Sequence, residues 1–373
     1  MPRDPRLDIV RGWLQLTIFA SHAFGSWIGV WLIHGAWGVS DSSEQFIFLS
    51  GLTLGSLFDY KLTRYGWRNA TRDMLMRAAR LYRTHLVVLC GFALVALTLR
   101  QTPALSDQIS MLRWSYWFVH PVQASAGALA LLYQPTFMDI LPLFILCMLA
   151  LPVFGILLAR VGHWALLLPL TIYAAVALFG LRPPWLGNSQ GGFNVLAWQI
   201  LFMLGAWVGR AIRRGTWRIP HQRCFAALAL LIVVGAAVLR LDQHGFLPWH
   251  LYEQFDAWID KRDLAPLRIM HALSLALLVA SIVPRDAVWM RARVFGVLAT
   301  IGRNSLRVFC LGLFLSLACS LVFQLQPYSV WLDLLLMGGG AGLLAAYAVL
   351  VERRGGGSLA SAQSPQLRSA TGA

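Results

Sequence analysis

Apolar segments long enough to cross a lipid bilayer recur from one end of this chain to the other. Hydrophobic residues make up 58% of the sequence and charged residues only 13%. Apolar runs of roughly 18 residues or more are typical of transmembrane helices and exclude a soluble globular class. The sequence therefore predicts an all-α polytopic membrane protein.

The apolar segments predict a bundle of about ten transmembrane helices. The expected spans are residues 7–33, 44–62, 82–99, 138–159, 164–181, 194–212, 224–241, 266–284, 303–324 and 329–351. We expect one membrane domain over residues 1–354, followed by a disordered tail at 355–373, which is rich in Gly, Ser, Ala and Gln. The chain has no convincing internal repeat, which disfavours a transporter built from inverted repeats.

The distribution of Lys and Arg predicts which helix ends face the cytoplasm, because cytoplasmic loops are enriched in basic residues. The segment between the second and third spans carries Lys61, Arg64, Arg68, Arg72, Arg77 and Arg80. Residues 34–43 contain no Lys or Arg, and the later basic clusters alternate so that both termini are predicted to be cytoplasmic. Topology thus accounts for the net charge of +15 without a nucleic-acid partner. The longer loops at 100–137 and 242–265 carry tryptophans, which favour re-entrant or interfacial helices.

A polar stripe runs along the first predicted span. Arg11 and His22 are eleven positions apart, so at about 100° per residue they return to nearly the same helical face, about 16 Å apart along the axis. The same face carries Asp8, Gln15 and Ser26. Charged side chains at membrane depth are costly, so we expect this stripe to face the interior of the bundle and to have a function.

The two strongest members of this stripe each have a functional and a structural interpretation. His22 is suited to act as a general base towards an incoming hydroxyl, or it hydrogen-bonds a neighbouring helix. Arg11 is suited to bind a phosphate or the pantetheine arm of a coenzyme, or it pairs with Asp8 at the start of the helix.

Further candidates lie at the ends of the other spans or interrupt them. Asp41 and Glu44 form a capping-box pattern before the second span, or they orient His22 or hold a sugar hydroxyl. Ser50 and Gly51 favour close helix packing. The remaining candidates for a buried or anion-binding site are Arg77, Arg80, Gln199, His271 and Arg303, with His271 the second choice for a buried site. No metal-ligand spacing and no motif of a soluble enzyme was found in the sequence.

Several segments resemble OpgC-type proteins, the osmoregulated periplasmic glucan succinyltransferases. They are RLDIVRG at 6–12 with His22, GVSDSSEQFIFLSG at 38–51, RAARLYRTHL at 77–86, DILPLFILCMLALPVF at 139–154, FNVLAWQILFMLGAWVG at 193–209, KRDLAPLRIMHALSLAL at 261–277 and IGRNSLRVFCLG at 301–312. That family belongs to a wider superfamily of membrane acyltransferases, marked by an Arg, ten residues and a His in the first span. Arg11 and His22 keep this spacing.

The resemblance implies a ten-helix membrane acyltransferase domain, a cytoplasmic acyl-coenzyme A donor, a periplasmic acceptor hydroxyl and His22 as the catalytic residue. We therefore expect an inner-membrane O-acyltransferase of a Gram-negative bacterium that moves a succinyl group from succinyl-coenzyme A to a glucan. Acyl-coenzyme A would be a co-substrate, with no tightly bound cofactor and no metal, and membrane lipids and a second copy of the chain are compatible partners. Arginines such as Arg11, Arg77 and Arg80 would steer the donor. His22 would deprotonate the hydroxyl or carry the acyl group itself, aligned by Asp41 or Glu44.

Three alternatives remain open. The polar stripe also suits a transporter or flippase of an anionic lipid or saccharide. The same pattern fits an acetyltransferase that acts on another surface polysaccharide. A third alternative is a catalytically silent binding component of a glucan-synthesis complex.

Overall fold

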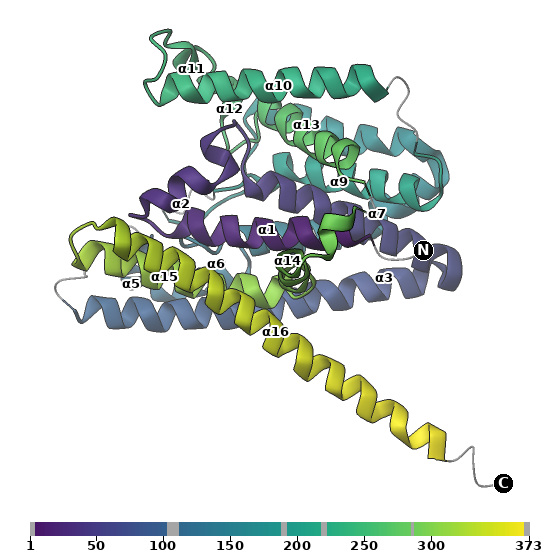
Figure 1. Cartoon of the computed structure of the whole chain (residues 1–373). Helices are drawn as coiled ribbons and strands as arrows, with labels where there is room; N and C mark the ends of the chain where they lie inside the picture. The colour runs from purple at the N-terminus through teal and green to yellow at the C-terminus, as the bar shows by residue number, and fades with distance from the viewer. Residues whose placement is uncertain (1–3, 103–111, 188–191, 218–221, 285–286, 369–373) are drawn as a thin grey trace. The chain divides into compact units, whose positions relative to one another are not determined.

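The computed structural model describes residues 4–102, 112–187, 192–217, 222–284 and 287–368, with side chains described up to Arg354 (Figure 1). Within these ranges the chain forms α-helices, short 3-10 helices and turns, and no β-strand. The prediction of an all-α chain is therefore confirmed. The helices belong to two compact units, one comprising Met1–Ala36 with Ala280–Ala373 and the other comprising Trp37–Val279.

The first unit is built around α1, which packs against α14 and α15, while α16 packs against both of these helices. Its helices are α1 (Pro5–His22), α2 (Trp27–Leu32), η1 (His34–Ala36), η4 (Val288–Arg291), α14 (Arg293–Arg303), α15 (Ser305–Leu325) and α16 (Val330–Arg368). Phe19, Val308 and Leu344 bring α1, α15 and α16 together in one apolar core. The predicted disordered tail at 355–373 stays a prediction.

The second unit is centred on α3, α7 and α9, which pack against one another. Its helices are α3 (Ser42–Arg100), α5 (Ser115–Val119), α6 (Pro121–Leu129), α7 (Ile140–Val161), η3 (Gly162–Leu166), α8 (Leu167–Phe179), α9 (Val195–Arg213), α10 (Gln222–Gln243), α11 (Leu251–Gln254), α12 (Asp256–Ile259) and most of α13 (Pro266–Ile282). The short helices α5, α6, α11 and α12 lie where the tryptophan-bearing loops were predicted to form interfacial helices.

Each predicted span contains helix, and within the described residues six helical segments are long and apolar enough to cross a membrane. These six are Ser42–Arg100, Ile140–Phe179, Val195–Arg213, Gln222–Gln243, Ser305–Leu325 and Val330–Arg354. A multi-pass membrane protein is thus supported, whereas the count of ten spans and the cytoplasmic termini are not confirmed and stay predictions. The apolar window of α10 is only 11% buried, with Leu230, Leu231 and Val234 exposed. An apolar surface of this kind is expected to face lipid.

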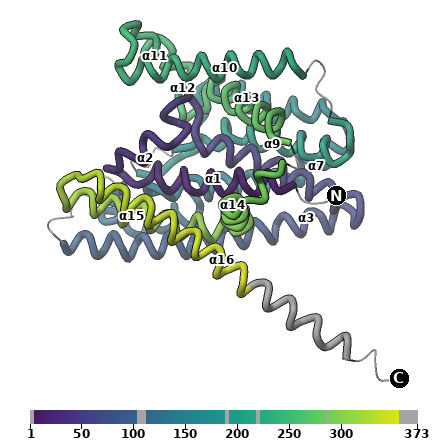
Figure 2. Tube along the Cα trace, in the orientation of Figure 1, coloured from purple at the N-terminus to yellow at the C-terminus, as the bar shows by residue number. Residues whose placement is uncertain are grey.

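The longest helical segment, α3, contains the second and third predicted spans and is interrupted between them. Gly66 has φ +77° and ψ 170°, a backbone conformation that is nearly restricted to glycine. The helix is kinked at this residue. Figure 2 shows the trace of α3. The two apolar halves of α3 are therefore separate helices that meet at one glycine.

The prediction of one continuous helix over 7–33 is wrong. The helix α1 ends at His22, Gly25 adopts φ +99°, and α2 begins after Ser26. The Ser26 hydroxyl accepts the Gly29 N–H at 2.7 Å and donates to buried Asp333 of α16 at 2.6 Å. Helix capping by a serine side chain competes with continuation of the preceding helix, so Ser26 does not belong to the same helix as His22.

Small residues let α3 and α9 approach backbone to backbone. A Cβ atom added at Gly51 would lie 2.0 Å from the carbonyl oxygen of Phe202, and one at Gly209 would lie 1.9 Å from that of Leu52. Each helix carries two such glycines four residues apart, Gly51 and Gly55 on α3 and Gly205 and Gly209 on α9. This small-residue spacing is the usual device of tight transmembrane helix pairs. The prediction that Gly51 serves helix packing is confirmed.

We expect Gly209→Ala to lower the free energy of unfolding by about 1–3 kcal/mol, because overpacking forces the two helices apart. The control is Gly235→Ala on α10, where an added Cβ meets nothing within 4 Å. Removing a glycine from an open helical position is expected to be neutral or stabilising by up to about 1 kcal/mol. Thermal unfolding of both variants in the same detergent measures the difference. Equal midpoints for the two variants would contradict the close packing.

Candidate functional site

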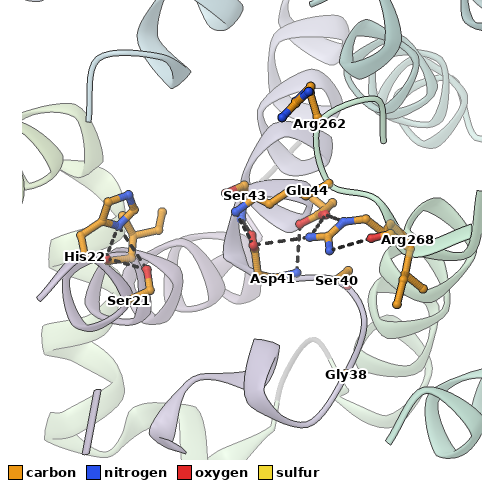
Figure 3. Close-up of polar contacts among 12 residues, drawn as sticks. Ser21, His22, Gly38, Ser40, Asp41, Ser43, Glu44, Arg262 and Arg268 are labelled. Carbon is orange, nitrogen blue, oxygen red and sulfur yellow. Dashed lines mark hydrogen bonds and ion pairs between the residues drawn. The ribbon is translucent and has the colours of Figure 1, made fainter. Parts of the chain in front are cut away.

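His22 occupies the last position of α1, where its ring is held by the helix's own final turn (Figure 3). The ring Nδ1 lies 2.7 Å from the Ile18 carbonyl oxygen and 3.1 Å from the Ser21 hydroxyl. A carbonyl oxygen only accepts hydrogen bonds, so this contact assigns a proton to Nδ1 and, in the neutral ring, the lone pair to Nε2. The orientation of His22 therefore makes Nε2 the basic atom.

Two serines of α15 fix the turn that carries His22. The Ser316 hydroxyl donates to the Phe19 carbonyl at 2.9 Å, and the Ser320 hydroxyl accepts the Phe24 N–H at 2.8 Å. Both serines are fully buried. Hydrogen bonds between helices hold backbone positions firmly within a membrane bundle, so α15 acts as a support for the end of α1.

The other polar residues of α1 lie near its crossing with α14. Asp8 is buried, and a Cβ atom added at Gly302 would lie 1.9 Å from the Asp8 carbonyl oxygen. Arg303, which was predicted as a donor-binding residue, forms an ion pair with Glu352 at 2.7 Å. Arg11 is partly buried on α1, and its predicted pairing with Asp8 or with a phosphate stays a prediction.

Asp41 and Glu44 begin α3 and belong to a buried charge cluster (Figure 3). Asp41 accepts the Ser43 N–H at 2.8 Å, and Glu44 accepts the Asp41 N–H at 2.9 Å, so the predicted capping box is confirmed. Glu44 is 0% exposed and receives the Arg268 Nε–H at 2.6 Å, while Lys261 lies 2.5 Å from the Asp41 carboxylate. Two acids and two bases thus join the start of α3 to α13 and the loop before it.

His271 lies one turn after Arg268 on α13 and holds the segment before α3. Its Nδ1 lies 2.7 Å from the Ser40 hydroxyl and 3.3 Å from the Ser40 nitrogen, whose N–H it accepts. One turn into α3, the Gln45 amide donates to the Ala272 carbonyl at 3.0 Å. His271 and Gln45 therefore dock the charge cluster onto α13, and the structure brings His271 together with Asp41 and Glu44 as parts of one site.

The cluster sets opposite pKa shifts on its two partly exposed members. Burial by itself would raise the pKa of Asp41, but the charges of Lys261 and Arg268 outweigh burial and hold that pKa well below its usual value. Burial by itself would lower the pKa of Lys261, whereas Asp41 and Glu44 raise it above its usual value. Both groups therefore stay charged across the physiological range.

Neither member of this ion pair changes its own charge between about pH 4 and about pH 10, the reference pKa values of its members. Below that range the contribution of Asp41 is lost as pH falls through its lowered folded pKa. Above that range the contribution of Lys261 is lost as pH rises through its raised folded pKa. Because the Lys261 side chain is 44% exposed, we expect Lys261→Met to cost about 1 kcal/mol or less. Unfolding midpoints of the two proteins at pH 7 provide the test, and a loss well above 1 kcal/mol would contradict it.

The remaining predicted site residues lie elsewhere in the second unit. Arg77 pairs with Asp73 at 2.8 Å on α3, and Arg80 is exposed one turn further on. The Gln199 amide donates to the Pro169 carbonyl at 2.8 Å, which links α9 to α8. In the described part of the chain, no three His, Cys, Asp or Glu side chains gather as a possible metal site. A role of these residues in donor binding stays a prediction.

Sequence reasoning missed Arg268, Lys261 and Ser40. Arg268 lies inside the predicted span 266–284, and a charge within an apolar segment is the same signal that drew attention to His22. Lys261 lies in the loop before that span, next to other charged residues, so nothing in the sequence distinguished it from them. The acidic partners of both were named, but their pairing required the fold.

The fold and these polar interiors define a multi-pass, all-helical membrane protein with buried ionisable groups. The sequence matches the model of the OpgC protein family over residues 3–355, nearly the whole chain, so the protein belongs to that family. The resemblance seen in the sequence is thereby confirmed. The family assignment suggests an acyltransferase that acts on glucans. Neither a curated protein nor a solved structure matches the chain.

Proposed function

We propose that this protein is an inner-membrane O-acyltransferase that transfers a succinyl group from cytoplasmic succinyl-coenzyme A to hydroxyls of periplasmic glucans. Family membership over residues 3–355 supports the reaction class. The observation that carries the proposal is the orientation of His22, whose Nδ1 lies 2.7 Å from the Ile18 carbonyl oxygen. This contact leaves Nε2 as the atom able to accept a proton from an acceptor hydroxyl.

The proposed reaction is direct transfer. Nε2 of His22 takes the proton of the glucan hydroxyl while the hydroxyl oxygen attacks the thioester carbonyl carbon. A carbon–oxygen bond forms, the carbon–sulfur bond breaks, and the departing thiolate takes the proton back from the imidazolium. The products are a glucan ester and free coenzyme A. The Ile18 carbonyl stabilises the imidazolium during this cycle by keeping its hydrogen bond from Nδ1–H.

The charge cluster at the start of α3 is proposed to bind the acceptor. The Asp41 side chain is 26% exposed, whereas Glu44 and Arg268 are buried. An exposed carboxylate that is held charged by Lys261 accepts hydrogen bonds from sugar hydroxyls well. Glu44 and Arg268 would then fix the position of Asp41 without touching the sugar.

Mass analysis of periplasmic glucans from cells with and without this protein tests the proposal. We expect succinyl groups to be lost in the deletion strain and restored by the intact gene, and succinyl differs from acetyl in both mass and charge. Full acylation in the deletion strain would contradict the proposal. Loss of acetyl groups alone would support an acyltransferase but would contradict succinyl-coenzyme A as its donor. Purified protein that moves a saccharide across vesicles without consuming acyl-coenzyme A would favour a transporter.

A further inference from the structure

Three arginines at the end of α9 converge on one buried carboxylate. Asp59 of α3 is 3% exposed and accepts hydrogen bonds from Arg210, Arg213 and Arg214. Arg210 also donates to the Leu158 carbonyl of α7. One negative charge therefore faces three positive charges, and the cluster has an excess of two positive charges. An excess of positive charge of this kind attracts anions.

The three arginines differ in the exposure of their side chains and in the number of their hydrogen-bond partners. The side chains of Arg210, Arg213 and Arg214 are 14%, 23% and 37% exposed, so their exposure increases along the chain. Among the described residues, Arg214 donates hydrogen bonds only to Asp59. A guanidinium carries five N–H donors, so the two outer arginines have donors left for a ligand.

A tryptophan is folded back against the same end of α9. Gly215 adopts φ +68°, and the Trp217 N–H donates to the Ala211 carbonyl at 3.2 Å. The Trp217 ring meets the Trp207 ring edge to face, with centroids 5.5 Å apart, and Trp217 remains 36% exposed. The turn thus presents a rigid, partly exposed indole three positions after Arg214.

From this arrangement we infer that Arg213, Arg214 and Trp217 bind the phosphorylated adenosine end of the coenzyme A donor. Guanidiniums bind phosphate groups through paired hydrogen bonds, and an indole face stacks on a purine. The inference rests on the proposed function, because it assigns a place to the donor of that reaction. It also differs from the sequence prediction, which gave this role to Arg11, Arg77 and Arg80. Arg77 is paired with Asp73, which in turn pairs with Lys61 at 2.6 Å.

Binding of coenzyme A to the purified protein in phosphatidylcholine nanodiscs tests the inference. We expect Arg214→Gln to weaken binding about tenfold and the Arg213→Gln/Arg214→Gln pair to weaken it further, because each substitution removes a charged hydrogen bond. Trp217→Ala should weaken binding several-fold. The matched controls are Arg291→Gln/Arg293→Gln, which removes the same number of arginines from an exposed segment, and Trp164→Ala, which removes an exposed tryptophan. Both controls should leave the Kd unchanged, and thermal unfolding verifies that every variant is folded.

The possible outcomes distinguish a failure of this binding site from a failure of the proposed acyl-transfer reaction. Competition by the bisphosphorylated adenosine fragment of coenzyme A, lost in the Arg213→Gln/Arg214→Gln variant, supports the inference even if no acyl transfer is found. Unchanged Kd and unchanged acyl-coenzyme A dependence in this variant overturn the inference while leaving the acyltransferase intact. Lipid-dependent thermal stabilisation by phosphatidylglycerol that requires Arg213 and Arg214, without an effect on coenzyme A binding, overturns it in favour of a lipid headgroup.

Discussion

Replacing His22 with alanine is expected to lower the rate of acyl transfer by a factor of about 10²–10⁴, the usual contribution of a positioned general base. The substitution removes the only atom to which the proposed reaction gives the acceptor proton. Alanine is a good helix former and His22 is the last residue of α1, so the fold should tolerate the change. The measurement is the initial rate at which purified protein releases free coenzyme A thiol in the presence of a glucan acceptor.

Two further histidine variants make this test specific. His163 is exposed in η3, and His163→Ala should leave the rate unchanged. His271 is buried and accepts hydrogen bonds from Ser40, so His271→Ala should lower the unfolding midpoint more than His22→Ala does. Retention of the full rate by His22→Ala, with the binding of coenzyme A unchanged, would contradict the role of His22 as the base.

Much of the fold could be predicted from the sequence, because membrane helices have a strong local signal. Each predicted span contains helix, and the capping box at Asp41 and Glu44 formed as its residues predict. Lipid solvates apolar side chains on the outside of a bundle, so hydropathy reports the spans well. The local signal did not predict how many helices have the length and hydropathy of a full span, and among the described residues six helices do.

The break in the first span could not be predicted from its own residues. The sequence around Gly25 and Ser26 is compatible with a continuous helix until Asp333 is placed beside it. The Ser26–Asp333 contact joins positions 307 apart, and Asp333 also accepts the Ile28 N–H at 2.9 Å. The local Ser26 cap and a distant carboxylate therefore together fix the start of α2, and the periodicity of the segment does not predict the second contact.

The acidic residues of the candidate site could be predicted from the sequence, but the basic residues that pair with them could not. Asp41 and Glu44 follow a local spacing rule, whereas the Glu44–Arg268 contact joins positions 224 apart. Likewise, the arginines at the end of α9 fitted a topology signal, and only the position of Asp59 on α3 shows that they converge. A single sequence reports which residue types are costly in a membrane, and the fold decides which of them meet.

Breaking the Glu44–Arg268 pair is expected to be the most destabilising single change in the second unit. Arg268→Met should lower the free energy of unfolding by about 3–5 kcal/mol, because the fully buried Glu44 loses its guanidinium and must either stay charged without compensation or take up a proton. Glu44 is 0% exposed and the Arg268 side chain is 6% exposed, so water cannot replace the lost partner. Unfolding in a detergent of fixed composition measures the change.

The control is Arg182→Met, because Arg182 forms a comparable ion pair with Asp263 at 2.9 Å but is 51% exposed. An exposed pair of this kind contributes about 1 kcal/mol or less. A double-mutant cycle with Glu44→Gln then isolates the pair. Glutamine keeps an oxygen that can accept the Asp41 N–H and removes the buried charge, so the double variant should be less destabilised than the sum of the single variants. Additive costs, or a loss in Arg268→Met no larger than in Arg182→Met, would contradict a buried ion pair and would leave Asp41 without the support proposed for acceptor binding.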